Sequence, residues 1–161
     1  MEFRQASPDD WPAIWPIWHT VVAAGETYTY DPGTDEATAR TLWMQPPPAE
    51  VWVAVEDARV VATALLRPNQ PGLGDHVANA GFMVDPAAAG RGIGRALAER
   101  VLERARERGF AAMQFNAVVS TNTRALTLWR SLGFEIVGTV PEAFRHPRHG
   151  AVDLHIMHRF L

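Results

Sequence analysis

The stretch from Val84 to Leu97 constrains the fold of this chain more than any other, because it joins an apolar strand to a long helix through a loop of small residues. Pro86 has no N–H to donate to a sheet ladder, so the strand must end before it. Gly90, Gly92 and Gly94 carry no Cβ, so a ligand can approach the backbone closely. The first N–H groups of a helix lack an internal partner and carry the positive end of its dipole, so the stretch predicts a phosphate or pyrophosphate site.

Several kinds of strand-to-helix loop end in glycines of this sort. A Walker A loop requires Lys and then Ser or Thr after its last glycine, whereas Arg95 and Ala96 follow Gly94 here. A dinucleotide fingerprint requires G-x-G-x-x-G, whereas residues 90–95 read G-x-G-x-G-x, and no acidic residue closes a later strand at the right spacing. On the loop alone, a turn that binds no ligand stays open as an alternative.

A further reading of the loop is a resemblance to a known family. Residues 89–94 resemble the acetyl-CoA pyrophosphate loop of the GCN5-related N-acetyltransferases (GNAT), Q/R-x-x-G-x-G/A. Ala89 stands where Gln or Arg is expected, but backbone N–H groups supply most of such a site. Asn122–Phe134 resembles the family's N-x-x-A-x-x-L/F-Y-x-x-x-G-F helix. These two motifs stand in the family's order, ~30 residues apart, and together identify the chain as a member.

Composition excludes several other classes. The 161 residues suit a single domain over 1–161, and 47% hydrophobic with 20% charged content is typical of a globular protein. A net charge of −3 argues against nucleic acid as a partner. The chain has no cysteine, and no apolar run approaches the ~20 residues of a membrane span. Met1–Gln5 has no signal-peptide character, so we expect a cytoplasmic protein without a membrane partner.

Hydrophobic periodicity predicts strands that alternate with helices, and hence an α/β layered sheet. Strands are expected at 2–6, 51–55, 60–66, 77–84, 112–119, 135–140 and 151–160. Helices are expected after Ser7, after Thr34, from Gly92 to Arg108, and after Ser120 or Thr121. Pro16 should kink or divide the first helix, and Gly25 should end it. The resemblance implies the GNAT fold, a mixed, mostly antiparallel sheet that is splayed at the acetyl-CoA site and flanked by helices.

The resemblance also implies acetyl-CoA as cosubstrate, with no metal. Backbone groups near Phe82, Met83 and Val84 would pair with the pantetheine amides, because the splay leaves that strand edge unpaired. An N–H near Val84 would donate to the oxyanion. The pyrophosphate would lie on the segment formed by Arg91, Gly92, Ile93, Gly94, Arg95 and Ala96. Asn122 would contact the cofactor near its pantetheine end, although a plain helix cap is an equally open role.

Position 129 departs from the family pattern. The family usually has Tyr there, whose hydroxyl can protonate the departing CoA thiolate. Trp129 has an indole N–H that donates a hydrogen bond but cannot act as an acid near neutral pH. Either another donor serves, or the thiolate leaves with hydrogen-bond stabilisation alone, which a thiol pKa of ~8.5 tolerates.

Two asparagines mark a candidate acceptor site. Asn79 and Asn116 interrupt neighbouring apolar strands, and a buried amide must bond either backbone or a substrate. By the strand period of two, Gln114, Asn116 and Val118 should share one face. Glu26 opens the loop after the first helix, where this family builds its acceptor pocket, so it is the candidate general base. A structural amide and an exposed loop carboxylate are the respective alternatives.

Residues 79–84 and 115–122 resemble a subgroup that contains fungal acetyltransferases of proline analogues such as azetidine-2-carboxylate. The predicted function is acetyl transfer to the amine of a small molecule, with an amino acid or proline analogue as its finer form. A non-catalytic acyl-CoA sensor, which Trp129 favours, and a protein N-acetyltransferase are the alternatives. A homodimer is expected only from the family.

Histidines cluster near the C-terminus but complete no ligand set. The H-x-x-H spacings at 146–149 and 155–158 lack a Cys or acidic cluster, so a metal site is disfavoured. Phe144, Arg145 and His146 are expected in a loop on the acceptor side. Arg145 or Arg148 could meet a substrate carboxylate there.

Overall fold

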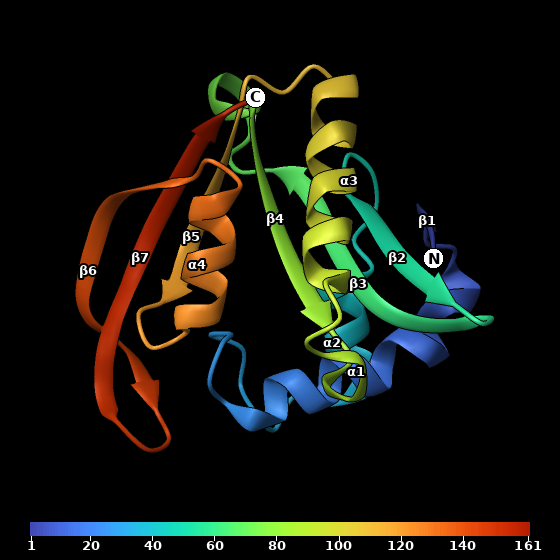
Figure 1. Ribbon diagram of the computed structural model, residues 1–161, viewed down its shortest axis with the longest axis horizontal. Coiled ribbons are helices and arrows are strands. Elements are labelled where there is room, and N and C mark those ends of the chain that lie inside the picture. The colour runs from blue at the N-terminus through green and yellow to red at the C-terminus, as the bar shows by residue number, and fades with distance from the viewer.

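A seven-stranded sheet in the order β1-β2-β3-β4-β5-β7-β6 runs through the computed structural model, which describes all 161 residues (Figure 1). The strands are β1 (Glu2–Gln5), β2 (Glu50–Glu56), β3 (Arg59–Pro68), β4 (Val77–Val84), β5 (Ala112–Val119), β6 (Glu135–His146) and β7 (Gly150–Phe160). The helices are α1 (Trp11–Ala24), α2 (Glu36–Trp43), α3 (Ile93–Glu107) and α4 (Thr123–Ser131). Only β4 and β5 pair in parallel, so the predicted mixed and mostly antiparallel sheet is confirmed.

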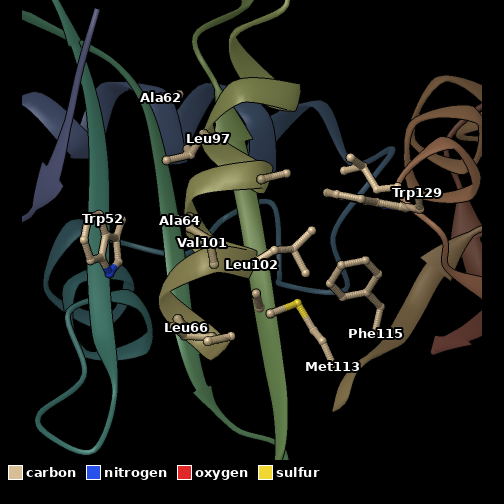
Figure 2. Close-up of a cluster of buried hydrophobic side chains, with 14 of the residues drawn as sticks. Trp52, Ala62, Ala64, Leu66, Leu97, Val101, Leu102, Met113, Phe115 and Trp129 are labelled. Carbon is tan, nitrogen blue, oxygen red and sulfur yellow. The ribbon is translucent and has the colours of Figure 1, made fainter. Parts of the chain in front are cut away.

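Each face of the sheet carries its own core. Alternate residues of β2 point to opposite faces, so Trp52 belongs to the core under α3 and α4 whereas Val53 belongs to the core under α1 and α2. Figure 2 shows part of the first cluster, in which side chains of α3 (Leu97, Val101, Leu102) lie near those of β3 (Ala62, Ala64, Leu66). The uninterrupted apolar run at 51–55 is therefore explained by a strand covered on both faces.

The sheet opens between β4 and β5. Only two residue pairs join these strands, Val77 with Ala112 and Ala78 with Met113, and beyond them the strands diverge (Figure 1). The side chain of Asn79 lies at the point of separation and donates from Nδ2 to the carbonyl oxygen of Gln114 at 2.9 Å. The splay expected from the family resemblance is therefore present.

The first helix differs in detail from its prediction. A short 3-10 turn of residues Pro8–Asp10 follows Ser7 in the chain, and α1 begins only at Trp11. Pro16 lies inside α1 without dividing it, because a proline in the second turn removes one helical hydrogen bond while tertiary packing holds the rest. Gly25 ends the helix in the left-handed conformation, with φ of 69°, as predicted.

The caps of α2 and α4 were predicted a residue or two too early. Asp35, not Thr34, caps α2, since its carboxylate accepts a hydrogen bond from the N–H of Thr38 at 2.8 Å. Asn122, not Ser120 or Thr121, caps α4. Runs of adjacent cap-forming residues leave the local signal ambiguous, and tertiary packing selects the residue that begins the helix.

The strand prediction of 135–140 is too short. β6 resumes after a register shift between Val140 and Phe144, where Glu142 has φ of 52° and its N–H donates to the Asp153 carboxylate at 2.9 Å. Phe144, Arg145 and His146 are therefore strand residues that pair with β7, and their assignment to a loop is wrong. A bulge absorbs the proline at 141, which would otherwise have ended the strand.

Candidate active site

A cavity of about 460 Å³ lies where β4 and β5 separate. Its walls come from the segment between α1 and α2, from β3 to β5, and from α4. The residues that line it include Tyr28, Tyr30, Arg67, Asn79, Phe82, Val84, Phe115, Asn116, Asn122 and Trp129. The structure thus brings together both predicted asparagines, part of the predicted β4 edge, and Asn122 and Trp129 of the second motif.

The glycine loop follows β4 at the end where the strands are apart. Gly90 and Gly92 have φ of 83° and 79°, and a Cβ added at either would meet nothing within 4 Å. Gly92 precedes α3 without any side-chain cap, and the first helical bond runs from the N–H of Ala96 to its carbonyl. The N–H groups of residues 93–95 therefore stand outside the helical ladder and suit a pyrophosphate.

Two arginines flank this loop, and both are exposed. The Arg91 guanidinium lies 2.7 Å from the Glu56 carboxylate, and Arg95 lies 3.5 Å from Glu99. Exposed ion pairs of this kind contribute only ~0–1 kcal/mol to stability, so either arginine can exchange its partner for a phosphate at little cost.

Tyr28 is a site residue that the sequence interpretation missed. The N–H of Phe82 donates to the Tyr28 hydroxyl at 2.8 Å, and that hydroxyl donates to the carbonyl oxygen of Phe82, also at 2.8 Å. The expectation of an unpaired β4 edge is thus wrong at Phe82, where a side chain meets both backbone groups. Desolvation raises the pKa of the Tyr28 phenol above its usual range, so the side chain is a neutral donor.

Gly81 makes room for this contact. A Cβ at position 81 would lie 3.2 Å from the Tyr28 oxygen and 3.2 Å from the Trp43 ring. Tyr28 and Phe82 are 54 residues apart, so no local pattern indicated their pairing. The one available signal was a glycine within an apolar strand, which often marks a close approach of another group.

The opposite wall of the cavity is aromatic. The ring centroid of Trp129 lies 5.2 Å from that of Phe82 and 4.6 Å from that of Phe115. Trp129 is 8% exposed, and none of the side-chain hydrogen bonds in the protein involves its indole N–H. Asn122 acts as a helix cap, with Oδ1 accepting from the N–H of Ala125 at 3.2 Å. Its Nδ2 makes no hydrogen bond within the protein, which leaves a donor at the cavity.

The two candidate acceptor asparagines belong to one chain of amides. Beyond the bond from Asn79 to the Gln114 carbonyl, the Gln114 side chain donates to Asn116 Oδ1 at 2.9 Å, and Asn116 donates to Asn69 Oδ1 at 2.7 Å. Asn79 is half-buried and Asn116 is exposed, so the prediction of two buried amides is wrong. A bulge after Phe115 also turns Val118 away from the face that Gln114 and Asn116 share.

Glu26 lies beside the turn between β6 and β7. Its carboxylate forms an ion pair with Arg148, whose N–H donates to His146 Nδ1 at 3.1 Å. The hydrogen bond from Arg148 lowers the pKa of Glu26, and Glu26 is not among the residues that line the cavity. Arg148 is likewise occupied, which weakens its prediction as a contact for a substrate carboxylate.

No group of three or more His, Asp or Glu side chains stands close enough to hold a metal ion. None of the helices combines the length and the apolar character that a membrane crossing needs.

Comparison with known proteins gives one family and several relatives. The sequence model of the acetyltransferase (GNAT) family matches residues 11–134. The chain is 55% identical to a GCN5-related N-acetyltransferase from Kribbella flavida, and the two structures superpose with a TM-score of 0.95 over 99% of this chain and 97% of that one.

Two further relatives are more distant. The structure of yncA from Salmonella typhimurium, which contains its cofactor acetyl-CoA, is 27% identical and superposes with a TM-score of 0.84 over 100% of this chain and 94% of that one. The N-acetyltransferase aca1 from Schizosaccharomyces pombe is 33% identical over 138 residues, which are 85% of this chain. The chain spans 60% of the length of that fungal relative.

Proposed function

This chain belongs to the acetyltransferase (GNAT) family, and we propose that it transfers the acetyl group of acetyl-CoA directly to the amine of a small molecule. The observation that carries the proposal is the cavity between the separated strands β4 and β5. At the open end of the gap lie a glycine loop and the free N–H groups of α3, which suit a pyrophosphate. An acyl group bound along β4 would then lie between the aromatic wall and the asparagines.

The residues of this chain have separable roles in the proposal. The start of α3 binds the pyrophosphate, and Asn122 Nδ2 supplies a donor near the pantetheine. Val84 presents its backbone groups on the same strand edge as Phe82, by the strand period of two. The N–H of Phe82 becomes available to the cofactor or the oxyanion only when Tyr28 moves away from it.

No carboxylate lines the cavity, so Glu26, our candidate base, would act through water. Arg148 keeps the Glu26 carboxylate ionised, which suits a base that relays a proton but makes it a weak one. The CoA thiol has a pKa of ~8.5 and can leave with hydrogen-bond stabilisation alone.

The size of the cavity supports a small acceptor. The cavity of about 460 Å³ lies in the range of ~300–1,000 Å³ that holds small ligands. The resemblance of residues 79–84 and 115–122 to the proline-analogue subgroup supports an amino acid or proline analogue as the acceptor. We keep a cytoplasmic homodimer as a family-based proposal.

Release of free CoA thiol over a panel of amines tests the proposal. The panel should contain cyclic secondary amino acids such as azetidine-2-carboxylate and proline, primary amino acids, simple amines, and a basic peptide. We expect turnover with at least one small amine. Acetyl-CoA binding without any turnover would favour the sensor, and turnover of the peptide alone would favour a protein acetyltransferase.

The first kinetic prediction concerns Trp129. Because its indole N–H has no partner in the protein, Trp129→Phe should preserve the aromatic packing and most of the turnover. The measurement is kcat at saturating acetyl-CoA, with the melting temperature as the control for folding. A fall in kcat of more than about a hundredfold would show that the indole N–H acts in the transition state, at ~2.7 kcal/mol.

The second kinetic prediction concerns Asn116. Its side chain is exposed, so Asn116→Ala should change stability little. Any change in kinetics can then be assigned to the site and not to loss of folding. If the amide orients the amine, kcat and kcat/KM should fall together by roughly ten- to hundredfold, with acetyl-CoA affinity unchanged. A lower melting temperature with kcat nearly intact would instead assign Asn116 to the amide chain with Gln114 and Asn69 and remove it from the site.

A further inference from the structure

We propose that Arg67 binds an anionic group on the acceptor, so that the substrates of this site are amines that also carry a carboxylate or a comparable anion. The inference rests on the proposed function, since it concerns the same cavity. Arg67 would select the acceptor by its negative charge. It also replaces the earlier candidates, because Arg148 is ion-paired and Arg145 lies outside the cavity.

Charge within the cavity carries the proposal. Arg67 is the single charged residue among the 22 that line it, and no Asp or Glu is among them. A small amine is largely cationic near neutral pH, so an isolated guanidinium would repel a simple amine. An amine that carries an anion removes this repulsion, because the anion pairs with the guanidinium while the amine is held apart from it.

Arg67 lacks the partner that a structural arginine has. Its Nη1 donates to the neutral Gln45 Oε1 at 3.2 Å, and it makes no ion pair. By contrast, Arg104 is ion-paired with Glu50 at 2.9 Å, and Arg91 with Glu56. A half-buried cation without a counter-ion is costly, and a ligand anion would remove that cost.

The surroundings of Arg67 suit an anion and the adjacent amine. Arg67 lies on β3 directly opposite Asn79 on β4, and Asn79 Nδ2 is already bonded to Gln114, so its Oδ1 is left to accept from an amine. The Tyr30 hydroxyl also lines the cavity and makes no hydrogen bond within the protein, so it adds a neutral donor. Burial raises the pKa of the Tyr30 phenol, and the nearby positive charge of Arg67 offsets part of that rise.

The position along the sheet is also suitable. Asn79 and Phe82 are three residues apart on β4, about 10 Å at the rise of an extended strand. Phe82 is where an acetyl group would meet the backbone. The Arg67 side chain covers part of that distance. The short separation between the amine and the carboxylate of an amino acid covers the rest. A long diamine or a lysine side chain would place its second cation against Arg67.

The test compares matched acceptors on matched variants. The acceptors are azetidine-2-carboxylate with azetidine-2-carboxamide, and proline with prolinamide, in each of which the ring and the amine are kept while the anion is lost. The variants are wild type, Arg67→Gln, Arg67→Lys, and Arg59→Gln as the control, because Arg59 is an exposed residue at the far end of the same strand. The measurement is kcat/KM at saturating acetyl-CoA, with calorimetry for acetyl-CoA affinity and a melting temperature for folding.

Wild type should prefer each carboxylate over its carboxamide by at least about a hundredfold, as expected for a desolvated charge pair. Arg67→Gln should lose most of that preference, chiefly through a higher KM for the carboxylate, with the carboxamide changed less than about threefold. The preference of Arg67→Lys for the carboxylate should lie between those of wild type and Arg67→Gln, because lysine keeps the positive charge but not the bidentate donors of the guanidinium. Arg59→Gln should match wild type. Each variant is compared with wild type by its ratio of kcat/KM for the carboxylate to kcat/KM for the carboxamide. The difference in amine pKa between acid and amide is the same for every variant, so it cancels in this comparison.

Three results would overturn the inference in distinguishable ways. If wild type acetylates carboxylates and carboxamides equally, or if Arg67→Gln lowers both alike, the assignment of Arg67 is wrong while the proposed acetylation of small amines stands. If wild type acetylates none of the small amines and only the peptide, the proposed function itself fails, and the inference fails with it. Weaker acetyl-CoA binding in Arg67→Gln would assign the guanidinium to the cofactor instead.

Discussion

Replacement of Gly94 by Glu should abolish acetyl-CoA binding, with a loss of affinity of at least about a hundredfold, while the protein stays folded. Gly94 lies in the first turn of α3, among the N–H groups that would hold the pyrophosphate. A carboxylate there occupies the anion site and repels the phosphates. The helix itself should tolerate the change, because Glu has a better helix propensity than Gly and interacts favourably with the N-terminal dipole.

Calorimetry with acetyl-CoA measures the effect, and thermal unfolding confirms the fold. Gly94→Ala is the matched control, since its Cβ would lie at an ordinary 3.4 Å from the Val84 side chain and brings no charge. Gly92→Glu should lose binding too, but with added strain, because residue 92 has φ of 79°. Unchanged acetyl-CoA affinity in folded Gly94→Glu would refute the assignment of the loop.

Trp43→Ala should lower the free energy of unfolding by ~3–5 kcal/mol, the largest effect on stability that we expect from a residue behind the cavity. Trp43 is fully buried, and its indole N–H donates to the Thr63 hydroxyl at 3.0 Å. Its ring also backs Gly81 and lies edge-on to Tyr28, with centroids 6.3 Å apart. Removing it leaves a cavity and an unsupported Tyr28. It also takes one hydrogen bond from the Thr63 hydroxyl, which keeps its bond to the Trp52 carbonyl oxygen.

Denaturant or thermal unfolding measures this change, and the melting temperature should fall by about 6–20 °C for a chain of this size. Leu42→Ala, at the half-buried neighbouring position on α2, is the control and should cost clearly less. Trp43→Ala should also weaken the hydrogen bonds between Tyr28 and Phe82, because the ring that supports Tyr28 is removed. A cost below ~1 kcal/mol would contradict the role of Trp43 as the support of this wall.

The strand, loop and helix around Val84–Leu97 could be predicted from sequence because every signal there is local. An apolar run, a proline, glycines and a 3.6-residue periodicity each act on neighbouring residues. The same holds for the second motif and for the glycine that ends α1. These segments determined the family, and with it the mixed sheet and its splay.

Local signals failed where several residues competed or where a distant strand intervened. Thr34 and Asp35 both form good caps, and the packing of α2 chose between them. β6 continued past the proline at 141 because pairing with β7 outweighed the local tendency to stop. The bulge in β5 reversed the side of Val118, which a strict period of two cannot anticipate.

The sequence by itself determined that a phosphate-binding loop precedes an amphipathic helix in a GNAT chain, because those properties depend on short stretches of backbone and residue pattern. Only the tertiary structure decided what surrounds the reacting group. Tyr28 meets Phe82 across 54 residues, and Asn79 meets Gln114 across 35. Arg67 shares their cavity because sheet registration sets it opposite Asn79. Contacts of this kind arise from how elements pack together, and so no pattern within any one element encodes them.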